Sequence, residues 1–234
     1  MSSELIDSNR RQFLKNAAVV VGGTLIAGSG LAKPLFGLEK KEEDVSPDED
    51  LMREHGVLRR IILIYREAMN RIEKARDLNP VLINKSATII RQFIEEYHEQ
   101  LEENFLFPRF EKAGRLVDLV TTLKTQHQAG RKLTDYILET TQTKSFKSHD
   151  KKLIEVLYQF INMYEPHAAR EDTVLFPAFK SIVSDSEYKE LGEKFEDEEH
   201  KRFGKKGFEG MVSQVAEIEK ELNIFDLANV TPKS

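Results

Sequence analysis

The sequence predicts an all-α protein, and three observations support that fold class. Charged residues make up 32% of the 234 residues, and the chain has no Trp, only 12 Gly and 7 Pro, which suits long helices better than sheets. Apolar residues recur at alternating steps of three and four along much of the chain, as on a helix with one buried face. In addition, a histidine-containing pattern with helical spacing occurs twice.

The repeated pattern is His98-x-x-x-Glu102-Glu103-x-x-Leu106-Phe107-Pro108 and His167-x-x-x-Glu171-Asp172-x-x-Leu175-Phe176-Pro177. Because a helix turns about 100° per residue, the histidine and the first glutamate of each copy share one helix face. A further histidine precedes each copy, since His55 lies 43 residues before the first and His127 lies 40 residues before the second. The chain is therefore predicted to contain two copies of a helical hairpin, and the Leu-Phe-Pro segment that both copies share is interpreted as a helix stop.

The first 47 residues are predicted to precede the folded domain. The segment Asn9-Arg10-Arg11-Gln12-Phe13-Leu14-Lys15 is similar to a twin-arginine export signal, and 17 uncharged residues follow it. That stretch is short and only mildly apolar for a spanning helix, which needs about 20 strongly apolar residues. Residues 1–32 are thus predicted to be a removed signal peptide, cleaved after Ala32 or Ser29. Residues 33–47, with prolines, a glycine and a run of charges, are predicted to form a linker.

Residues 48–180 are predicted to form four helices. The first begins near Asp48, where acidic residues interact favourably with the helix dipole, and Asn79-Pro80 ends it. Gly114 ends the second helix, and the polar segment 143–148 separates the third from the fourth. Each helix carries one histidine on its apolar seam. In chain order, the four seams are Leu51, His55, Leu58, Ile62, Tyr65, Met69 and Ile72; Ala87, Ile90, Ile94, His98, Leu101 and Phe105; Val120, Leu123, His127, Gly130, Thr134 and Ile137; and Ile154, Leu157, Phe160, Tyr164, His167, Glu171 and Val174.

Residues 181–234 are predicted to be a C-terminal helical extension packed on the bundle. One helical stretch, Glu187 to Leu222, places His200 on a face with two glycines and several apolar residues. Those glycines would let this helix approach the bundle closely, so His200 is a further candidate ligand. The remaining histidine, His149, follows the polar segment at a helix start, where a solvated or capping role is expected.

Four histidines and two glutamates are thus predicted to converge inside the bundle. A single seam histidine is most simply a buried side chain hydrogen-bonded to a neighbour. For four of them with two carboxylates, each buried group left unpaired would cost on the order of several kcal/mol. Bound cations remove this cost, and six ligands exceed what one tetrahedral site uses. Because the chain has no cysteine, any metal must bind His and carboxylate ligands, which suit iron, zinc or manganese.

These residues resemble the hemerythrin-like, His-His-Glu cation-binding family over residues 48 to about 180. The resemblance implies an up-down-up-down four-helix bundle around a non-haem di-iron centre bridged by carboxylates and an oxo or hydroxo group. By this resemblance, one iron takes His55 and His98 and the other takes His127 and His167. Glu102 and Glu171 bridge the two ions. The tyrosines near the seam histidines, Tyr65, Tyr97 and Tyr164, are candidate partners for the outer ring nitrogens, as metal-bound histidines usually need an acceptor.

The chain departs from the oxygen-carrying hemerythrins at two positions. Where they have a second histidine four residues after the one on the third helix, this chain has Arg131. They place the last carboxylate five residues after its histidine, which here is Asp172. On a regular helix Glu171, four residues after His167, is the better placed ligand, and Asp172 is the alternative if Pro166 distorts that turn.

Several functions are compatible with these residues. The leading hypothesis is an exported di-iron protein that binds O2 or NO, or that senses or buffers oxygen or iron. The alternatives are a di-iron redox enzyme acting on NO, peroxide or O2, or on iron centres by repair or iron delivery, and a metal-free helical interaction module. The net charge of −5 is spread over mixed helices, so no nucleic-acid partner is expected. The export signal implies a periplasmic or other extracytoplasmic location without stable membrane insertion. The sequence does not identify the electron donor.

Overall fold

The computed structural model describes residues 45–142 and 150–232, and every regular secondary-structure element in these ranges is a helix. This part of the chain belongs to one compact unit, Glu43–Ser234. Residues 1–32, which were predicted to be a signal peptide, lie outside the described residues, as do most of the predicted linker and His149. Within the described ranges, no helix is long and apolar enough to cross a bilayer.

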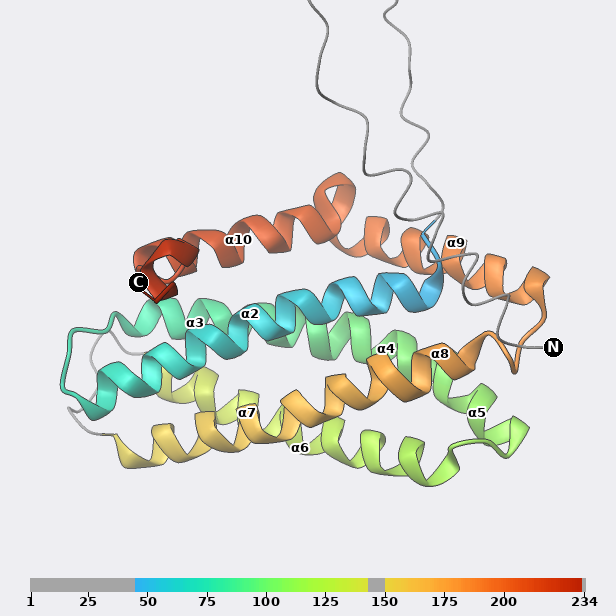
Figure 1. The fold of residues 1–234 in the computed structure, drawn as a ribbon, viewed down its shortest axis with the longest axis horizontal. Helices are drawn as coiled ribbons and strands as arrows, with labels where there is room; N and C mark the ends of the chain where they lie inside the picture. Colours follow the sequence, from blue (N-terminus) through green and yellow to red (C-terminus); the bar gives the residue numbers. More distant parts are fainter. Residues whose placement is uncertain (1–44, 143–149, 233–234) are drawn as a thin grey trace, which may run out of the picture. The chain divides into compact units, whose positions relative to one another are not determined.

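Four helical rods run up, down, up and down, which confirms the predicted fold class (Figure 1). The first rod is α2 (Pro47–Glu73) and the third is α6 (Val117–Thr141). The second and fourth rods are each built from several consecutive helical segments. The second consists of α3 (Pro80–Ile89), η1 (Ile90–His98), α4 (Glu99–Leu101), η2 (Glu102–Leu106) and α5 (Phe107–Ala113). The fourth consists of α7 (Lys151–Arg170), η3 (Glu171–Leu175) and α8 (Phe176–Phe179).

Local sequence accounts for where these rods begin and end. Pro47 opens α2, and three acidic residues occupy its first turn, where the helix dipole favours them. The side chain of Asn79 accepts a hydrogen bond from the Val81 N–H and caps α3. Asp150 caps α7 in the same way, through the N–H of Leu153. Gly114 ends α5 in the left-handed conformation, with φ of 62°, which a glycine adopts without steric cost.

The Leu-Phe-Pro segments do not end their helices as the sequence predicted. Both rods continue through them, and in each copy a short π-helical segment, η2 or η3, begins at the glutamate and gives way to α-helix at the phenylalanine. A proline lacks the N–H that would bond to the carbonyl four residues earlier. The local widening of the helix accommodates this loss, and π segments of this kind occur frequently at functional sites.

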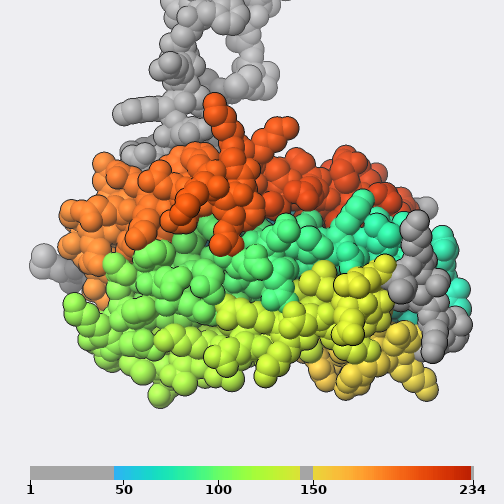
Figure 2. Space-filling view, turned by 180° about the vertical axis from the view of Figure 1, so that it is seen from behind, coloured from blue at the N-terminus to red at the C-terminus, as the bar shows by residue number. Residues whose placement is uncertain are grey.

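The C-terminal extension packs along the first and second rods. It consists of α9 (Asp185–Phe203), a short turn η4 (Gly204–Lys206), α10 (Gly207–Glu221) and a final turn η5 (Leu227–Val230). Figure 2 shows α9 and α10, in orange and red, lying along the green second rod. Aromatic rings join these elements, with Phe203 against Phe93 and Tyr97 at centroid separations of 5.5 and 5.3 Å and Phe195 against Phe105 at 5.9 Å.

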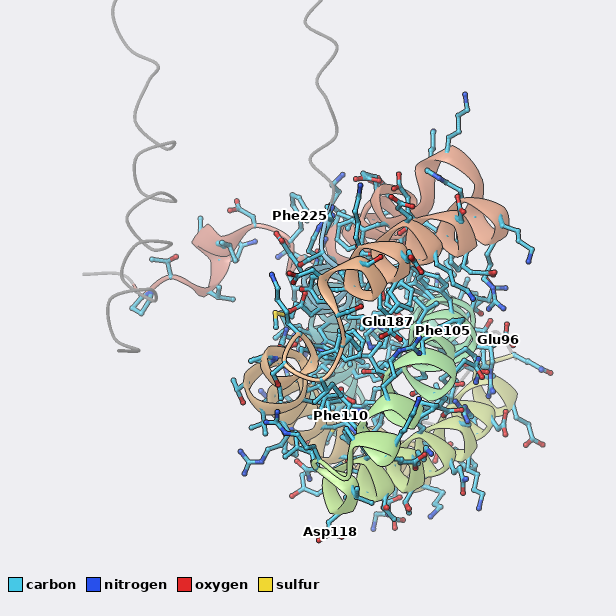
Figure 3. All side chains as sticks on the ribbon, turned by 90° about the vertical axis from the view of Figure 1, so that its right-hand side faces the viewer. Glu96, Phe105, Phe110, Asp118, Glu187 and Phe225 are labelled. Atoms are coloured by element: carbon cyan, nitrogen blue, oxygen red, sulfur yellow. The ribbon has the colours of Figure 1, made fainter. Side chains whose placement is uncertain are left out.

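The apolar core fills the space between the rods and closes one end of the bundle. Figure 3 views that end, where Phe110 points among the helices and Asp118 points outward. Phe110 is fully buried and packs against Phe179 of α8, with ring centroids 6.0 Å apart. Large buried side chains of this kind stabilise a helical bundle mainly by removing apolar surface from water. They also surround the polar residues that the bundle encloses at its centre.

Candidate metal centre

Six of the seven predicted ligands are buried at the centre of the four rods. They comprise one histidine from each rod and a glutamate from each of the second and fourth rods: His55, His98, Glu102, His127, His167 and Glu171. None is more than 3% exposed, and both glutamates are fully buried. Ionisable side chains are rarely buried this completely unless they are paired or bind a metal.

The two glutamates lie between two pairs of imidazoles. The rings of His55 and His98 have centroids 4.7 Å apart, and those of His127 and His167 are 5.0 Å apart. Glu102 Oε2 lies 3.7 Å from His98 Nε2 and 3.4 Å from His127 Nε2. Glu171 Oε2 lies 3.1 Å from His167 Nε2 and 3.4 Å from His55 Nε2. Each glutamate therefore lies between the two pairs and approaches one histidine of each.

The outer nitrogen of each imidazole has its own acceptor. The Nδ1 atoms bond to four side chains, with His55 bonding to Asp172 at 2.7 Å, His98 to Glu54 at 2.7 Å, His127 to Glu103 at 2.9 Å and His167 to Gln126 at 2.9 Å. A carboxylate only accepts hydrogen bonds, so a ring facing one donates its Nδ1–H and keeps the Nε2 lone pair for a metal. Such partners orient metal-bound histidines and increase their basicity.

These acceptors follow the internal repeat of the chain. The residue just before the first histidine of each hairpin, Glu54 or Gln126, bonds to the second histidine of the same hairpin. The acidic residue five positions after the second histidine, Glu103 or Asp172, bonds to the first histidine of the other hairpin. The three predicted tyrosines do not fill these positions. The sequence contained a signal for two of the acceptors, because a polar residue, Glu54 or Gln126, directly precedes the first histidine of each hairpin.

All four oxygens of the two central glutamates lack a hydrogen-bond partner among the described residues, and so does His127 Nε2. The nearest imidazole nitrogens are close to these oxygens but do not have hydrogen-bond geometry. Leaving a buried charged group unpaired is strongly unfavourable, because its lost hydration is not replaced. Cations placed among the carboxylate oxygens and the Nε2 atoms would satisfy both sets of lone pairs. The residues present therefore fit a bound metal.

Burial and neighbouring groups shift the pKa values of the two central glutamates in opposite directions. Burial and the neighbouring Glu171 carboxylate raise the pKa of Glu102 well above its usual range. Although burial acts in the opposite direction, the imidazoles of His167 and His55 hold the pKa of Glu171 well below its usual range. Burial and the adjacent His55 ring lower the pKa of His98. Neutral imidazoles and ionised carboxylates are the forms that bind metal, and a cation at this position would favour both.

Aromatic rings from the repeated Leu-Phe-Pro segments cover the histidines. The Phe107 ring stacks on His127 with a centroid separation of 5.6 Å, and the Phe176 ring stacks on His55 at 5.5 Å. Both phenylalanines are fully buried. The segment that follows each central glutamate therefore returns an apolar ring to the site. An apolar shell of this kind limits the access of water and lowers the local dielectric constant.

Arg131, the position where the oxygen carriers have a further histidine, binds to carboxylates outside the central cluster. Its Nη2 lies 2.8 Å from Glu99 Oε2 and 2.7 Å from Glu103 Oε1. Tyr164 donates to the other oxygen of Glu99 at 2.8 Å. The space that Gly130 leaves is filled by this tyrosine, because a Cβ atom at Gly130 would lie 2.0 Å from the Tyr164 hydroxyl oxygen.

The structure also separates the alternatives that the sequence left open. Glu171 lies in the cluster, whereas Asp172 bonds to His55 Nδ1 and forms an ion pair with Arg59. His200 is not brought to the cluster, because its side chain is exposed on α9. The helix that was predicted to carry it inward breaks at Gly204, where φ is 70°. Because of this break, the residues of α9 and those of α10 do not share one continuous helix face.

Comparisons with known proteins identify the family. The model of the hemerythrin HHE cation-binding domain matches residues 46–179, and matches again at residues 118–222. Uncharacterised proteins of Mycobacterium tuberculosis and Mycobacterium bovis are each 46% identical to this chain over 232 aligned positions, covering 95% of the chain and 91% of the relative. No solved structure matches. The chain belongs to the hemerythrin HHE cation-binding domain family.

Proposed function

We propose that the central cluster holds two iron ions and that this centre binds O2 or NO. One ion is held by His55 and His98, and the other by His127 and His167. Glu102 and Glu171 are shared between the two. The observation that carries the proposal is that all four buried carboxylate oxygens of Glu102 and Glu171 lack a hydrogen-bond partner among the described residues, while the two Oε2 atoms lie 3.1–3.7 Å from the four imidazole Nε2 atoms.

The donor set is compatible with iron, and its arrangement in a helical bundle supports an iron pair. Imidazole and carboxylate ligands together suit zinc, manganese and iron, and exclude metals that require sulfur. Pairs of glutamates with histidines inside a helical bundle are the donor arrangement of carboxylate-bridged di-iron proteins. A bound iron pair supplies one-electron chemistry toward a small diatomic ligand. The chain itself holds the Nδ1 protons on fixed acceptors and excludes water with the rings of Phe107 and Phe176.

A redox enzyme acting on NO, peroxide or O2 is the second candidate, and Arg131 is the observation that favours it. Because Arg131 is bound to Glu99 and Glu103, no fifth histidine is available at that position. The two ions would then have equivalent sets of two histidines and two shared carboxylates. Open positions on both ions favour turnover over reversible binding, since a carrier needs one stable open position.

Visible spectroscopy of the purified iron-loaded protein tests these functions. The proposal predicts an absorption band that changes when azide, O2 or NO is added, and a His127→Ala variant that loses the band. A band that forms under O2 and disappears on its removal supports carriage or sensing, whereas steady consumption of NO or peroxide supports the enzyme. An iron-loaded protein whose spectrum is unchanged by all of these ligands would contradict both functions.

We also propose that the protein is exported by the twin-arginine route to an extracytoplasmic location. The support is the Arg10-Arg11 motif and the uncharged stretch from Asn16 to Ala32. Replacing both arginines with lysine keeps the charge but removes the paired guanidinium groups. That variant is expected to remain in the cytoplasmic fraction of the host cell. Unchanged export of the lysine variant would reject this route.

A further inference from the structure

A second group of carboxylates adjoins the central cluster through Glu54, which bonds to His98. Asp50 and Glu54 are one turn apart on α2, and Glu199 reaches them from α9. One carboxylate oxygen from each residue lies within 4.8 Å of the other two. This separation is suitable for three ligands of one cation, because calcium–oxygen distances are about 2.3–2.6 Å.

Glu54 distinguishes this group from an ordinary acidic surface. Its side chain is fully buried, and one of its oxygens accepts the hydrogen bond from His98 Nδ1 at 2.7 Å. The other oxygen, Oε1, has no hydrogen-bond partner among the residues that the structure describes. A buried carboxylate with a free oxygen is expensive unless a positive group approaches it.

The nearby cationic side chain does not provide that compensation. Arg53 Nη1 lies 3.9 Å from Asp50, and the same guanidinium approaches Glu209 at 3.9 Å and the Phe208 ring at 4.7 Å. The helix dipole of α2 favours Asp50 in the first turn, but Glu54 lies a turn further along. Burial, followed by the Glu199 carboxylate, raises the pKa of Asp50 to about 6. Arg53 is thus shared among several groups and offsets the charge of the three carboxylates only in part.

The chain also makes room for the third carboxylate. Glu199 Oε1 accepts a hydrogen bond from the Phe208 N–H at 2.9 Å. A Cβ atom at Gly207 would lie only 1.7 Å from this oxygen. The glycine at the start of α10 thus lets the Glu199 side chain occupy this position. Both Glu199 and Asp50 remain partly exposed, so an ion could enter from solvent.

We propose that Asp50, Glu54 and Glu199 form a third cation site, distinct from the site of the two irons. All three ligands are hard carboxylate oxygens, so the ion is a hard divalent cation of the Ca2+, Mg2+ or Mn2+ class. Water completes its coordination on the exposed side. Glu54 connects this site to the central cluster, since its Oε2 bonds to His98 Nδ1 while its Oε1 has no partner among the described residues.

Terbium luminescence tests this proposal on the full iron-loaded chain, because Tb3+ replaces hard divalent cations and tyrosine sensitises its emission. Tyr97, whose hydroxyl lies beside Glu54, is the sensitiser. Wild type is expected to show a saturable signal with one Tb3+ per chain, displaced by Ca2+ or Mn2+. Asp50→Asn and Glu199→Gln should each weaken binding by at least about 10-fold. Glu198→Gln is the matched control, because Glu198 neighbours Glu199 on α9 but pairs with Lys201 and should leave the signal unchanged.

Three outcomes would overturn the site: no signal from wild type together with no Mn2+ binding by electron paramagnetic resonance, unchanged binding in both variants, or equal loss in the Glu198 control. Misfolding is checked by the thermal midpoint of the cation-free protein, which should rise in Asp50→Asn as repulsion is relieved. Iron is measured in the same samples. Loss of iron with an intact terbium signal would reject the iron proposal and leave this site standing.

Discussion

At the scale of single residues, the main feature is that ionisable side chains are buried at positions where an apolar side chain would cost less free energy to bury. Glu102 and Glu171 are fully buried and make no hydrogen bond in the described structure. Such groups need an ion-pair partner or a metal. Without one, their desolvation lowers the free energy of unfolding. The same side chains that would bind metal are therefore expected to destabilise the metal-free protein.

Glu102→Gln separates these two effects. Because the raised pKa keeps Glu102 protonated in the metal-free protein, folding at neutral pH must bind a proton that the amide does not need, so we expect the free energy of unfolding of the metal-free protein to rise by about 1–3 kcal/mol. The same change removes a shared ligand, so iron content should fall sharply. Urea unfolding of metal-free samples and elemental analysis of loaded samples measure the two quantities. Glu165→Gln, at the exposed pair with Arg66, is the control. A less stable variant that still holds full iron would contradict this account.

Glu95 provides a prediction about pH. Burial raises the pKa of Glu95 to about 7 from the usual 4.5, so between these values the folded chain binds a proton that the unfolded chain has released. This carboxyl group therefore makes the folded state less stable as pH rises through that interval. Glu95→Gln should gain stability relative to wild type between pH 5 and pH 8. A difference in unfolding free energy that is equal at both pH values would show that Glu95 is not perturbed.

The sequence predicted the buried histidines more easily than the side chains that accept their hydrogen bonds. The seam spacing of three and four placed His55, His98, His127 and His167 on buried faces, and all four are buried. Their Nδ1 acceptors depend on how two neighbouring helices are rotated against each other. That rotation is set by packing across the whole bundle, so a one-helix pattern does not contain it. The tyrosine prediction failed for this reason.

At the scale of helices, the π-helical segments η2 and η3 set the direction of the glutamates and the phenylalanines that follow them. The sequence contained a signal, since a proline lies six residues after the glutamate in both copies. We interpreted that proline as a helix stop. A π segment differs from an α-helix by one extra residue in a turn, and the same Leu-Phe-Pro residues are compatible with either outcome. Tertiary packing therefore decides between them.

Two glycines in helix interiors are predicted to respond in opposite ways to alanine. At Gly130 a Cβ atom would lie 2.0 Å from the Tyr164 hydroxyl, so Gly130→Ala should lower the free energy of unfolding by about 1–3 kcal/mol. At Gly56 no atom lies within 4 Å of the added carbon, so Gly56→Ala should raise it by up to about 1 kcal/mol through helix propensity. Denaturant unfolding of both variants measures these changes. Equal effects would mean that α6 and α7 are not packed as described.

At the scale of the whole described structure, composition and the internal repeat were sufficient to predict a helical bundle of two hairpins. The extension was harder, because α9 is strongly charged and only Leu191 and Phe195 of its residues are buried. One continuous helix was expected from Glu187 to Leu222, and the turn at Gly204 divides it in two. That turn leaves His200 on the exposed surface and brings Glu199 toward Asp50.

Metal stoichiometry tests the central claim most directly. Elemental analysis of the purified chain after anaerobic loading with ferrous iron and removal of loosely bound metal should give two iron ions per chain. In Glu171→Gln the count should fall, while His200→Ala should retain both ions because His200 lies outside the cluster. Wild-type protein that folds normally but holds no tightly bound iron would contradict the claim that four imidazoles and two carboxylates form a metal centre.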